Sequence, residues 1–249
     1  MRVIATYGIK GGVGKTSAAV NLATLAAEEN RRTLLWDLDP QGAAGYLLGV
    51  KPKVKGKVGS LGLLTGETDL EDAVKATSVD NLDLLPADVT IRTADTALED
   101  AKKPGKQLAR QLKTVQAAYD VVFLDCPPGL TLLSENVFAA VDILLVPLIP
   151  TPLSLRTFEQ LEEFLAKAGG RTPQVLAFFS MVDGRKTLHA DVRAELARRT
   201  SKLLTSSIPA ASAVERMAVN RRPIVATEPF GRAATAYREL WSELAGLLA

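Results

Sequence analysis

Short apolar runs of the buried-strand type alternate along this chain with longer segments of helical period, and this alternation limits the possible fold more than any other feature. Seven runs have the composition of strands, the last being the weakest: RVIATY, RTLLWDLD, LDLLPA, DVVFLDCPP, DILLVPLIP, QVLAFFSMV and LLTSSIP. Helical periodicity lies around residues 15–29, 104–118, 131–140, 154–168, 187–201, 211–219 and 232–248. Strands that are apolar on both faces and separated by helices are typical of a parallel sheet covered on both sides. The pattern predicts a doubly wound α/β fold with a mostly parallel sheet flanked by helices.

The composition fits one globular domain spanning residues 1–249. Hydrophobic residues make up 47% and charged residues 23%, which argues against disordered and fibrous classes. A chain of this length can bury one sizeable core. The single cysteine, Cys126, excludes an intrachain disulfide, and residues 1 to 8 lack the apolar core of a signal peptide. We therefore expect a cytoplasmic protein.

A glycine-rich loop follows the first predicted strand, in the segment TYGIKGGVGKTSAAVNLA. A loop G-x-x-x-x-G-K-[ST] between a strand and a helix wraps backbone N–H groups around phosphates, with its lysine on the β and γ oxygens and its hydroxyl on Mg²⁺. Gly14, Lys15 and Thr16 fit the end of this pattern, whereas Ile9 stands where the first glycine belongs. The predicted nucleotide contacts in the loop are Lys10, Gly11, Gly12, Val13, Gly14, Lys15, Thr16 and Ser17.

Two lysines flank this loop, Lys10 and Lys15, although one lysine would be enough to bind a phosphate. The stretch KGGVGKTS resembles the deviant Walker A loop of the ParA/MinD family of P-loop ATPases, whose signature is the first lysine, here Lys10. Lys15 begins a helix and is expected to face the phosphates of its own subunit, whereas Lys10 leaves the strand on the other side of the loop. The resemblance implies a homodimer that sandwiches two ATP molecules with Mg²⁺, with each Lys10 crossing the interface. The alternative is that Lys10 is a solvated loop lysine.

Two further predicted strands end in aspartates, and ligands of such sheets bind beyond the carboxyl ends of the strands. LLWDLDPQG resembles the family's DLDPQGN, with Ala43 in place of asparagine. The match implies that Asp39 orients or deprotonates the attacking water and that Asp37 supports the Mg²⁺ shell, although an aspartate in this setting can also merely start a turn. Asp125 in DVVFLDCPPG matches the Walker B segment and is expected to hold Mg²⁺ through water. The predicted catalytic residues are Lys10, Lys15, Asp39 and Asp125, and the predicted metal residues are Thr16, Asp37, Asp39 and Asp125.

Four other residues are interpreted by their surroundings in the sequence. The resemblance places adenine on loops after two later strands, where Met181 and Pro209 are the candidate contacts or else packing residues. Cys126 follows Asp125 directly and is expected to be a small core residue, since no partner histidine is suggested. His189, the only histidine, lies in a helix rich in charged residues and is expected on the surface.

A basic segment near the C-terminus is the candidate DNA contact. Residues 193–222 carry seven basic and two acidic side chains, a local surplus of +5 in a chain of net charge +2. Sequence-independent DNA binding depends on such charge, and the predicted contacts are Arg198, Arg199, Lys202, Arg216, Arg221 and Arg222. The family tends to have arginines where Ala210 and Ala213 stand here. Either the later arginines take over, or DNA binding is altered or lost. Lys51, Lys53, Lys55 and Lys57 form a second possible contact or a solvated loop.

The final segment, RAATAYRELWSELAGLLA, has an apolar stripe but lacks the cationic surplus that anionic lipid favours. We therefore expect a packed terminal helix and no membrane contact.

The resemblance implies an ATP hydrolase that is weak on its own, rides the nucleoid and positions a cargo. A ParB-like or cargo-adaptor protein would stimulate hydrolysis, and the cargo would be a chromosome or plasmid partition complex or a protein assembly. Two alternatives stay open. One is an ATP-dependent small-molecule enzyme of the dethiobiotin synthetase type, and the other is a dimerising regulatory switch that does not bind DNA.

Overall fold

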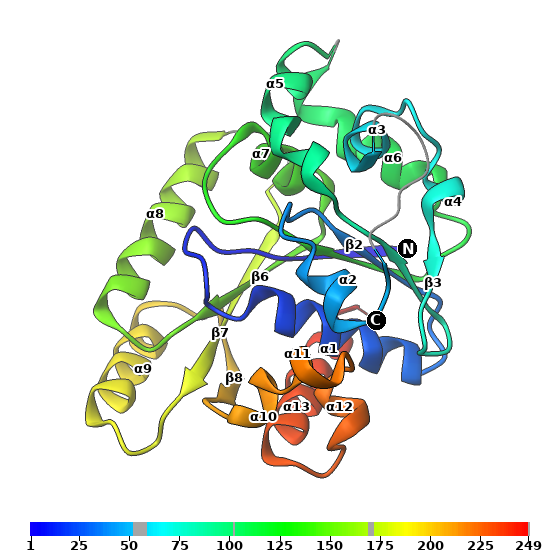
Figure 1. Cartoon of the computed structure of the whole chain (residues 1–249). Coiled ribbons are helices and arrows are strands. Elements are labelled where there is room, and N and C mark those ends of the chain that lie inside the picture. The colour runs from blue at the N-terminus through cyan, green and yellow to red at the C-terminus, as the bar shows by residue number, and fades with distance from the viewer. Residues whose placement is uncertain (52–58, 102, 169–171, 249) are drawn as a thin grey trace.

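The computed structural model describes residues 1–51, 59–101, 103–168 and 172–248, and its centre is one eight-stranded sheet (Figure 1). The strand order is β3-β4-β2-β5-β1-β6-β7-β8, and every neighbouring pair is parallel except β3 and β4. The strands are β1 (Arg2–Thr6), β2 (Thr33–Asp37), β3 (Lys75–Ala76), β4 (Leu82–Leu85), β5 (Val121–Asp125), β6 (Ile143–Leu148), β7 (Gln174–Val182) and β8 (Leu203–Pro209). All seven predicted runs form strands, and the mostly parallel, doubly wound sheet is confirmed.

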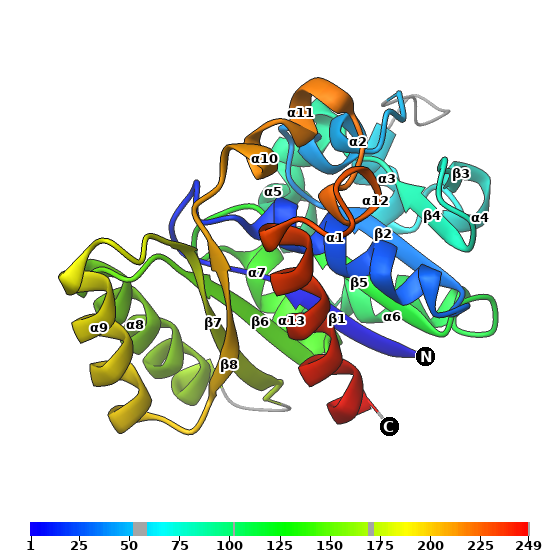
Figure 2. The same cartoon turned by 90° about the horizontal axis from the view of Figure 1, so that it is seen from below.

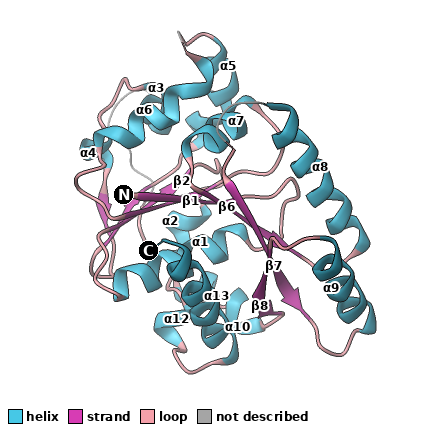
Figure 3. Cartoon of the chain, turned by 180° about the vertical axis from the view of Figure 1, so that it is seen from behind, coloured by secondary structure: helices cyan, strands magenta, loops and turns pink. Residues whose placement is uncertain are grey.

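Helices cover both faces of the sheet and make two hydrophobic cores (Figure 3). One face packs against α3 (Gly59–Thr65), α4 (Leu70–Ala73), α5 (Ala94–Glu99), α6 (Gln107–Thr114), α7 (Leu132–Ala140), α8 (Pro152–Ala168) and α9 (Thr187–Arg199). The other packs against α1 (Lys15–Glu28), α2 (Ala43–Leu47), α11 (Met217–Asn220), α12 (Ile224–Thr227) and α13 (Arg232–Leu248). The short helix α10 (Ser212–Glu215) lies next to α11, and two 3₁₀ turns cover Val89–Thr93 and Pro104–Lys106. Figure 2 shows α1 and α13 side by side across their face of the sheet.

The long helices agree with the predicted ones, whereas most short elements had no signal in the sequence. The structure adds α2, α3, α4, α5, α12 and the antiparallel strand β3, and it divides the predicted helix at 211–219 into α10 and α11. Each of these helices has seven residues or fewer. Two turns or less are too short for a 3.6-residue period to stand out from chance.

His189 corrects one expectation, because it is buried rather than on the surface. Its Nδ1 accepts a hydrogen bond of 3.1 Å from the backbone N–H of Asp183, so the ring fastens α9 to the end of β7. Asp191, Arg198 and Arg199 of the same helix are exposed. Cys126 is buried as expected.

The terminal helix α13 packs as expected. Its stripe of Tyr237, Leu240, Trp241, Leu244 and Leu248 is buried in the second core. Across the described ranges, no helix combines the length and the hydropathy needed to cross a membrane.

Strand register brings three polar side chains into line at the carboxyl edge of the sheet. Thr6 at the end of β1 and Asp37 at the end of β2 both pair with Asp125 at the end of β5. All three residues are completely buried. The chemistry predicted for separate segments therefore converges on one point of the fold.

Truncation of the α13 stripe tests this packing. Leu240 has no exposed surface, and we expect Leu240→Ala to lower the free energy of unfolding by about 2–5 kcal/mol. The matched control is Leu247→Ala on the same helix, where 45% of the residue is exposed and the change should be within about 0.5 kcal/mol. Urea unfolding followed by circular dichroism measures both, and equal losses would contradict the packing of this helix.

Candidate functional site

The glycine loop forms a cradle between β1 and α1. Gly12 and Gly14 have φ values of 72° and 93°, a left-handed region that glycine occupies without the usual steric cost. Gly14 caps α1 and accepts the N–H of Ala18 through its carbonyl, so the first N–H groups of the helix point into the loop. Helix N-termini with free N–H groups favour anions. The loop is therefore built to receive phosphate.

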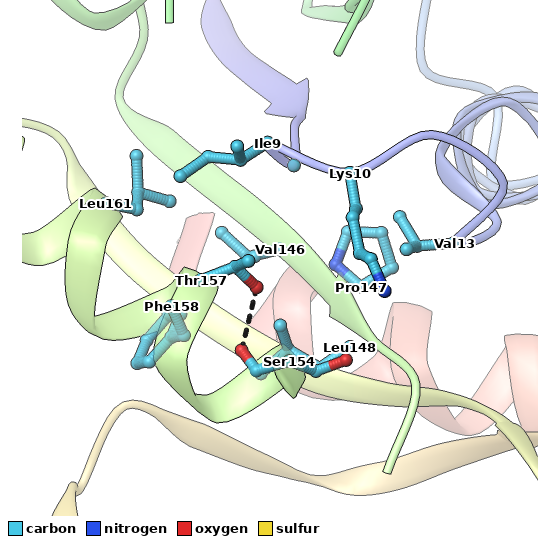
Figure 4. A pocket seen from close by; sticks show the side chains of 11 residues that line it. Ile9, Lys10, Val13, Val146, Pro147, Leu148, Ser154, Thr157, Phe158 and Leu161 are labelled. Carbon is cyan, nitrogen blue, oxygen red and sulfur yellow. Dashed lines mark hydrogen bonds between the residues drawn. The ribbon is translucent and has the colours of Figure 1, made fainter. Parts of the chain in front are cut away.

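The two lysines lie on opposite sides of this loop. Lys15 is buried, and its ammonium donates a hydrogen bond of 3.3 Å to the Lys10 carbonyl oxygen. Burial lowers the pKa of Lys15, and the nearby Asp125 carboxylate partly offsets that effect. Lys10 is exposed and lines a small cavity between the loop, β6 and α8 (Figure 4). Lys15 is thus buried within the loop, whereas Lys10 is exposed beside it.

Asp125 is the buried carboxylate beneath the cradle. Burial raises its pKa to about 7, and the charge of Asp39 acts in the same direction, whereas Thr16 and Lys15 favour its charged form. Its Oδ1 accepts a long hydrogen bond of 3.5 Å from the Thr6 hydroxyl. Its Oδ2 is buried and has no hydrogen-bond partner among the residues described. A buried carboxylate oxygen without a partner is costly unless a ligand or water supplies one.

Magnesium fits this arrangement. Mg²⁺ prefers oxygen ligands, keeps several waters and is usually held by one or two carboxylates together with substrate phosphates. Asp125 and Thr16 would hold it here, at the mouth of the loop. Where the chain is described, no group of three or more His, Cys, Asp or Glu side chains could hold a metal ion by itself. When bound, Mg²⁺ neutralises negative charge on phosphate oxygens.

Asp37 is fully buried and is hydrogen bonded to the chain that follows it. Its Oδ1 accepts from the N–H of Asp39 at 3.0 Å and its Oδ2 accepts from the N–H of Ala44 at 3.1 Å. Burial raises its pKa well above the ordinary range, with the charge of Asp125 adding to the effect. Asp37 therefore fixes the start of α2 and the position of Asp39.

Asp39 is half-buried, and its Oδ1 accepts from the N–H of Gln41 at 2.9 Å. This turn is the one expected of an aspartate before a proline. The same carboxylate is close enough to raise the pKa of Asp125. Asp39 thus combines the turn with a place at the predicted site.

Met181 is the second-to-last residue of β7 and Pro209 is the last residue of the neighbouring strand β8. Val182 pairs with Pro209, and the N–H of Ala210 donates to the Val182 carbonyl at 3.0 Å. Met181 has φ of 53°, an uncommon conformation for a residue with a side chain, and it is partly exposed. The two predicted adenine contacts are therefore brought together, and their role remains a prediction.

Two further residues hold the site and were missed in the sequence. The Tyr7 hydroxyl donates to the Gly129 carbonyl at 2.5 Å, which fastens the loop after β5 to the loop after β1. The Ser180 hydroxyl donates to the Val13 carbonyl at 2.7 Å, which fastens the cradle to β7. Neither residue stands out from its neighbours in the sequence, because each acts through a backbone carbonyl far along the chain.

The six predicted DNA contacts do not form one surface. Three of them precede β8 and three follow it, so the two groups lie at opposite ends of a seven-residue strand (Figure 2). At 3.3 Å per residue, the length of the strand that separates the two groups is roughly 20 Å. The group before the strand is Arg198, Arg199 and Lys202, and the group after it is Arg216, Arg221 and Arg222.

The second possible DNA contact falls mostly on residues that the structure does not describe. Lys51 lies within the described residues and is exposed, whereas Lys53, Lys55 and Lys57 lie outside them.

Comparison with known proteins places this geometry in a family. A family model described as an AAA domain matches residues 1–178. The sporulation initiation inhibitor protein Soj of Bacillus subtilis is 32% identical over 249 residues, covering 98% of both chains. The chain belongs to the ParA/MinD family of ATPases.

Solved structures of similar proteins agree with this assignment. A cobyrinic acid a,c-diamide synthase from Mycobacterium smegmatis with bound ADP and magnesium superposes with a TM-score of 0.83 and 29% identity, covering 98% of this chain and 94% of the other. The cell division ATPase MinD of Pyrococcus furiosus gives a TM-score of 0.81 and 25% identity over 99% of both chains. The predicted ParA/MinD assignment is confirmed.

The buried carboxylate of Asp125 predicts that the folding stability of the nucleotide-free protein depends on pH. Its raised pKa favours the neutral form, so its contribution is fully present below the pKa of an unfolded aspartate, about 3.9, and is lost as the pH rises through about 7. We expect wild-type protein to lose stability relative to Asp125→Asn between about pH 4 and pH 8. Urea unfolding measures the difference at each pH.

Asp120→Asn is the matched control, because Arg32 lowers the pKa of Asp120 to about 2. The stability that Asp120 contributes is lost only in acid. The difference in unfolding free energy between Asp120→Asn and wild type should therefore stay constant between about pH 5 and pH 8. A difference for Asp125→Asn that does not change with pH would contradict the electrostatics described for this site.

Proposed function

We propose that this chain is an ATPase that forms an ATP-dependent sandwich dimer, binds DNA without sequence specificity and positions a cargo on the nucleoid. ATP and Mg²⁺ are its cofactors. Hydrolysis is slow in the isolated protein and is stimulated by a ParB-like or cargo-bound partner. The cargo is a chromosome or plasmid partition complex or a protein assembly.

The observation that carries the proposal is the placement of the two lysines. Lys15 is buried in the cradle and bonded to the loop, so it serves the phosphates of its own subunit. Lys10 is exposed and lines a separate small cavity beside β6 and α8, so it is available to a nucleotide other than the one that Lys15 serves. A facing copy of the chain would bring a second nucleotide to Lys10. ATP then acts both as substrate and as the link between two subunits.

The aspartates support hydrolysis at this site. Asp125 and Thr16 are the residues proposed to hold Mg²⁺, which the unpartnered Asp125 Oδ2 supports, and Asp37 accepts from the N–H of Asp39 and so fixes the turn that presents Asp39. Asp39 remains half-buried at the mouth of the site and is the group proposed to orient or deprotonate water. General base work of this kind needs a carboxylate within hydrogen-bond reach of the water.

An ATP-dependent enzyme acting on a small molecule is the second candidate. It is favoured by the 29% identity with the structure named as a cobyrinic acid a,c-diamide synthase. Such an enzyme would hydrolyse ATP only with its substrate present. Steady ATP hydrolysis in its absence, dependent on protein concentration, would argue against this candidate.

Replacement of Lys10 separates the roles of the two lysines. We expect Lys10→Ala to bind ATP with nearly unchanged affinity and to lose hydrolysis, since a cation supplied in trans contributes on the order of 10³–10⁵ in rate in arginine-finger systems. Lys15→Ala is the control and should lose nucleotide binding itself. Titration calorimetry and phosphate release measure the two properties. Normal hydrolysis by Lys10→Ala would disprove a role for Lys10 in trans.

DNA binding should depend on the nucleotide. Two weak basic surfaces held together by ATP gain from effective concentration, so affinity for random duplex DNA should be highest with ATP and much lower with ADP or no nucleotide. The logarithm of affinity should fall linearly with the logarithm of salt concentration. Fluorescence anisotropy across a salt series measures this. Absence of binding at low salt in every nucleotide state would leave a dimerising switch or a small-molecule enzyme.

A further inference from the structure

The basic groups at the two ends of β8 differ in how they are paired. Arg199 contacts Glu159 at 2.8 Å and Lys202 contacts Glu162 at 2.6 Å, while Arg198 and Arg199 both pair with Glu195. Two of these three glutamates come from α8, outside the basic segment. Each of the three predicted contacts before β8 thus has a carboxylate beside it, which offsets the positive potential that would attract phosphate.

At the other end of β8, the pairing is weaker. Arg216 contacts Glu228 at 3.2 Å, but Arg221 and Arg222 form no ion pair with any residue that the structure describes, and both are exposed. Within the described part of the chain, these two are therefore the cations of the predicted set that are most available to a phosphate.

Arg221 is held in place by an aromatic ring. Its guanidinium carbon lies 4.8 Å from the ring centroid of Tyr46 on α2, within the range of a cation–π contact. Its backbone has φ of 48°, a left-handed conformation at the end of α11. A residue keeps this conformation only where its surroundings favour it, and here α11 packs against α2. Arg221 remains exposed beside the ring.

Two of the helices that contact this segment, α1 and α2, begin at the nucleotide site. Tyr46 is on α2, whose first turn is bonded to Asp37 through Ala44. On the other side, the buried Asn21 of α1 donates to the Met217 sulfur at 3.4 Å and accepts from the N–H of Val225 at 3.3 Å. The α11–α12 segment is therefore held by the helix of the phosphate loop and by the helix that follows the aspartates (Figure 1).

We propose that Arg221 and Arg222 are the phosphate contacts for DNA, that the basic residues before β8 are not, and that Tyr46 is a positioning residue for Arg221. The inference rests on the proposed DNA binding and says which surface carries it. Tyr46 and Asn21 make that surface continuous with the nucleotide site. Ala210 and Ala213 stand where the family tends to have arginines. Arg221 and Arg222, about ten residues later in the chain, would take over their role.

Two matched double variants test the surface, with ATP and a random duplex as the probe. Arg221→Asn with Arg222→Gln removes two charges and places at position 221 a residue that tolerates positive φ. Arg198→Gln with Arg199→Gln removes two charges before β8. We expect the first pair to weaken binding and to lower the slope of log affinity against log salt by about 0.9 for each phosphate that is no longer neutralised. The second pair should keep the wild-type slope.

Two single variants test Tyr46. Tyr46→Leu should weaken DNA binding with ATP about two- to fivefold, because it removes one exposed cation–π interaction, while ATP affinity stays as in wild type. Tyr46→Phe keeps the ring and should bind DNA like wild type.

The outcomes separate this inference from the proposed function. Wild-type protein that binds no DNA with ATP would overturn both. Wild-type binding that is abolished in the Arg198/Arg199 pair but kept in the Arg221/Arg222 pair would overturn only the inference. Equal DNA binding by Tyr46→Leu and wild type would remove the positioning role of Tyr46.

Discussion

A buried cation surrounded by buried carboxylates is the constraint on which the rest of this structure depends. Lys15, Asp125 and Asp37 lie under the glycine loop with little or no access to water. Burial raises the pKa of both carboxyl groups and lowers the pKa of the ammonium, so the cluster by itself disfavours its own charges. Phosphates and Mg²⁺ would supply partners for them. Strand register, which aligns Thr6 and Asp37 with Asp125, brings these groups together.

The same cluster explains how the nucleotide site is connected to a distant surface. Asp37 is bonded to the first turn of α2, and Asn21 joins α1 to the segment after β8. Tyr46 extends the first connection to Arg221. Packed elements that join two sites are one way in which the proposed DNA contact would respond to the nucleotide. In this chain α1 and α2 both begin at the nucleotide site and contact the α11–α12 segment.

Much of the fold and the centre of the site could be predicted from the sequence. Buried strands, long helices and the glycine loop have strong local patterns, and the carboxyl ends of parallel strands meet in space by the rules of the fold. The short helices carry too few turns for a period, and the burial of His189 depends on a backbone N–H that no pattern reveals. The basic residues of 193–222 are close in sequence, but β8 separates them and glutamates from α8 pair with some of them. Closeness in the sequence therefore does not predict a shared surface when a strand separates the residues.

The proposed function depends above all on ATP linking two copies of this chain. The most direct test is sedimentation velocity of Asp39→Ala, a variant expected to bind ATP without hydrolysing it, with Mg²⁺ and either ATP or ADP. We expect a mass twice that of the chain with ATP and a single chain with ADP, and we expect the further change Lys10→Ala to restore the single chain in ATP. A variant that stays monomeric at high concentrations of ATP would contradict the sandwich dimer, and so would a dimer that forms equally well with ADP.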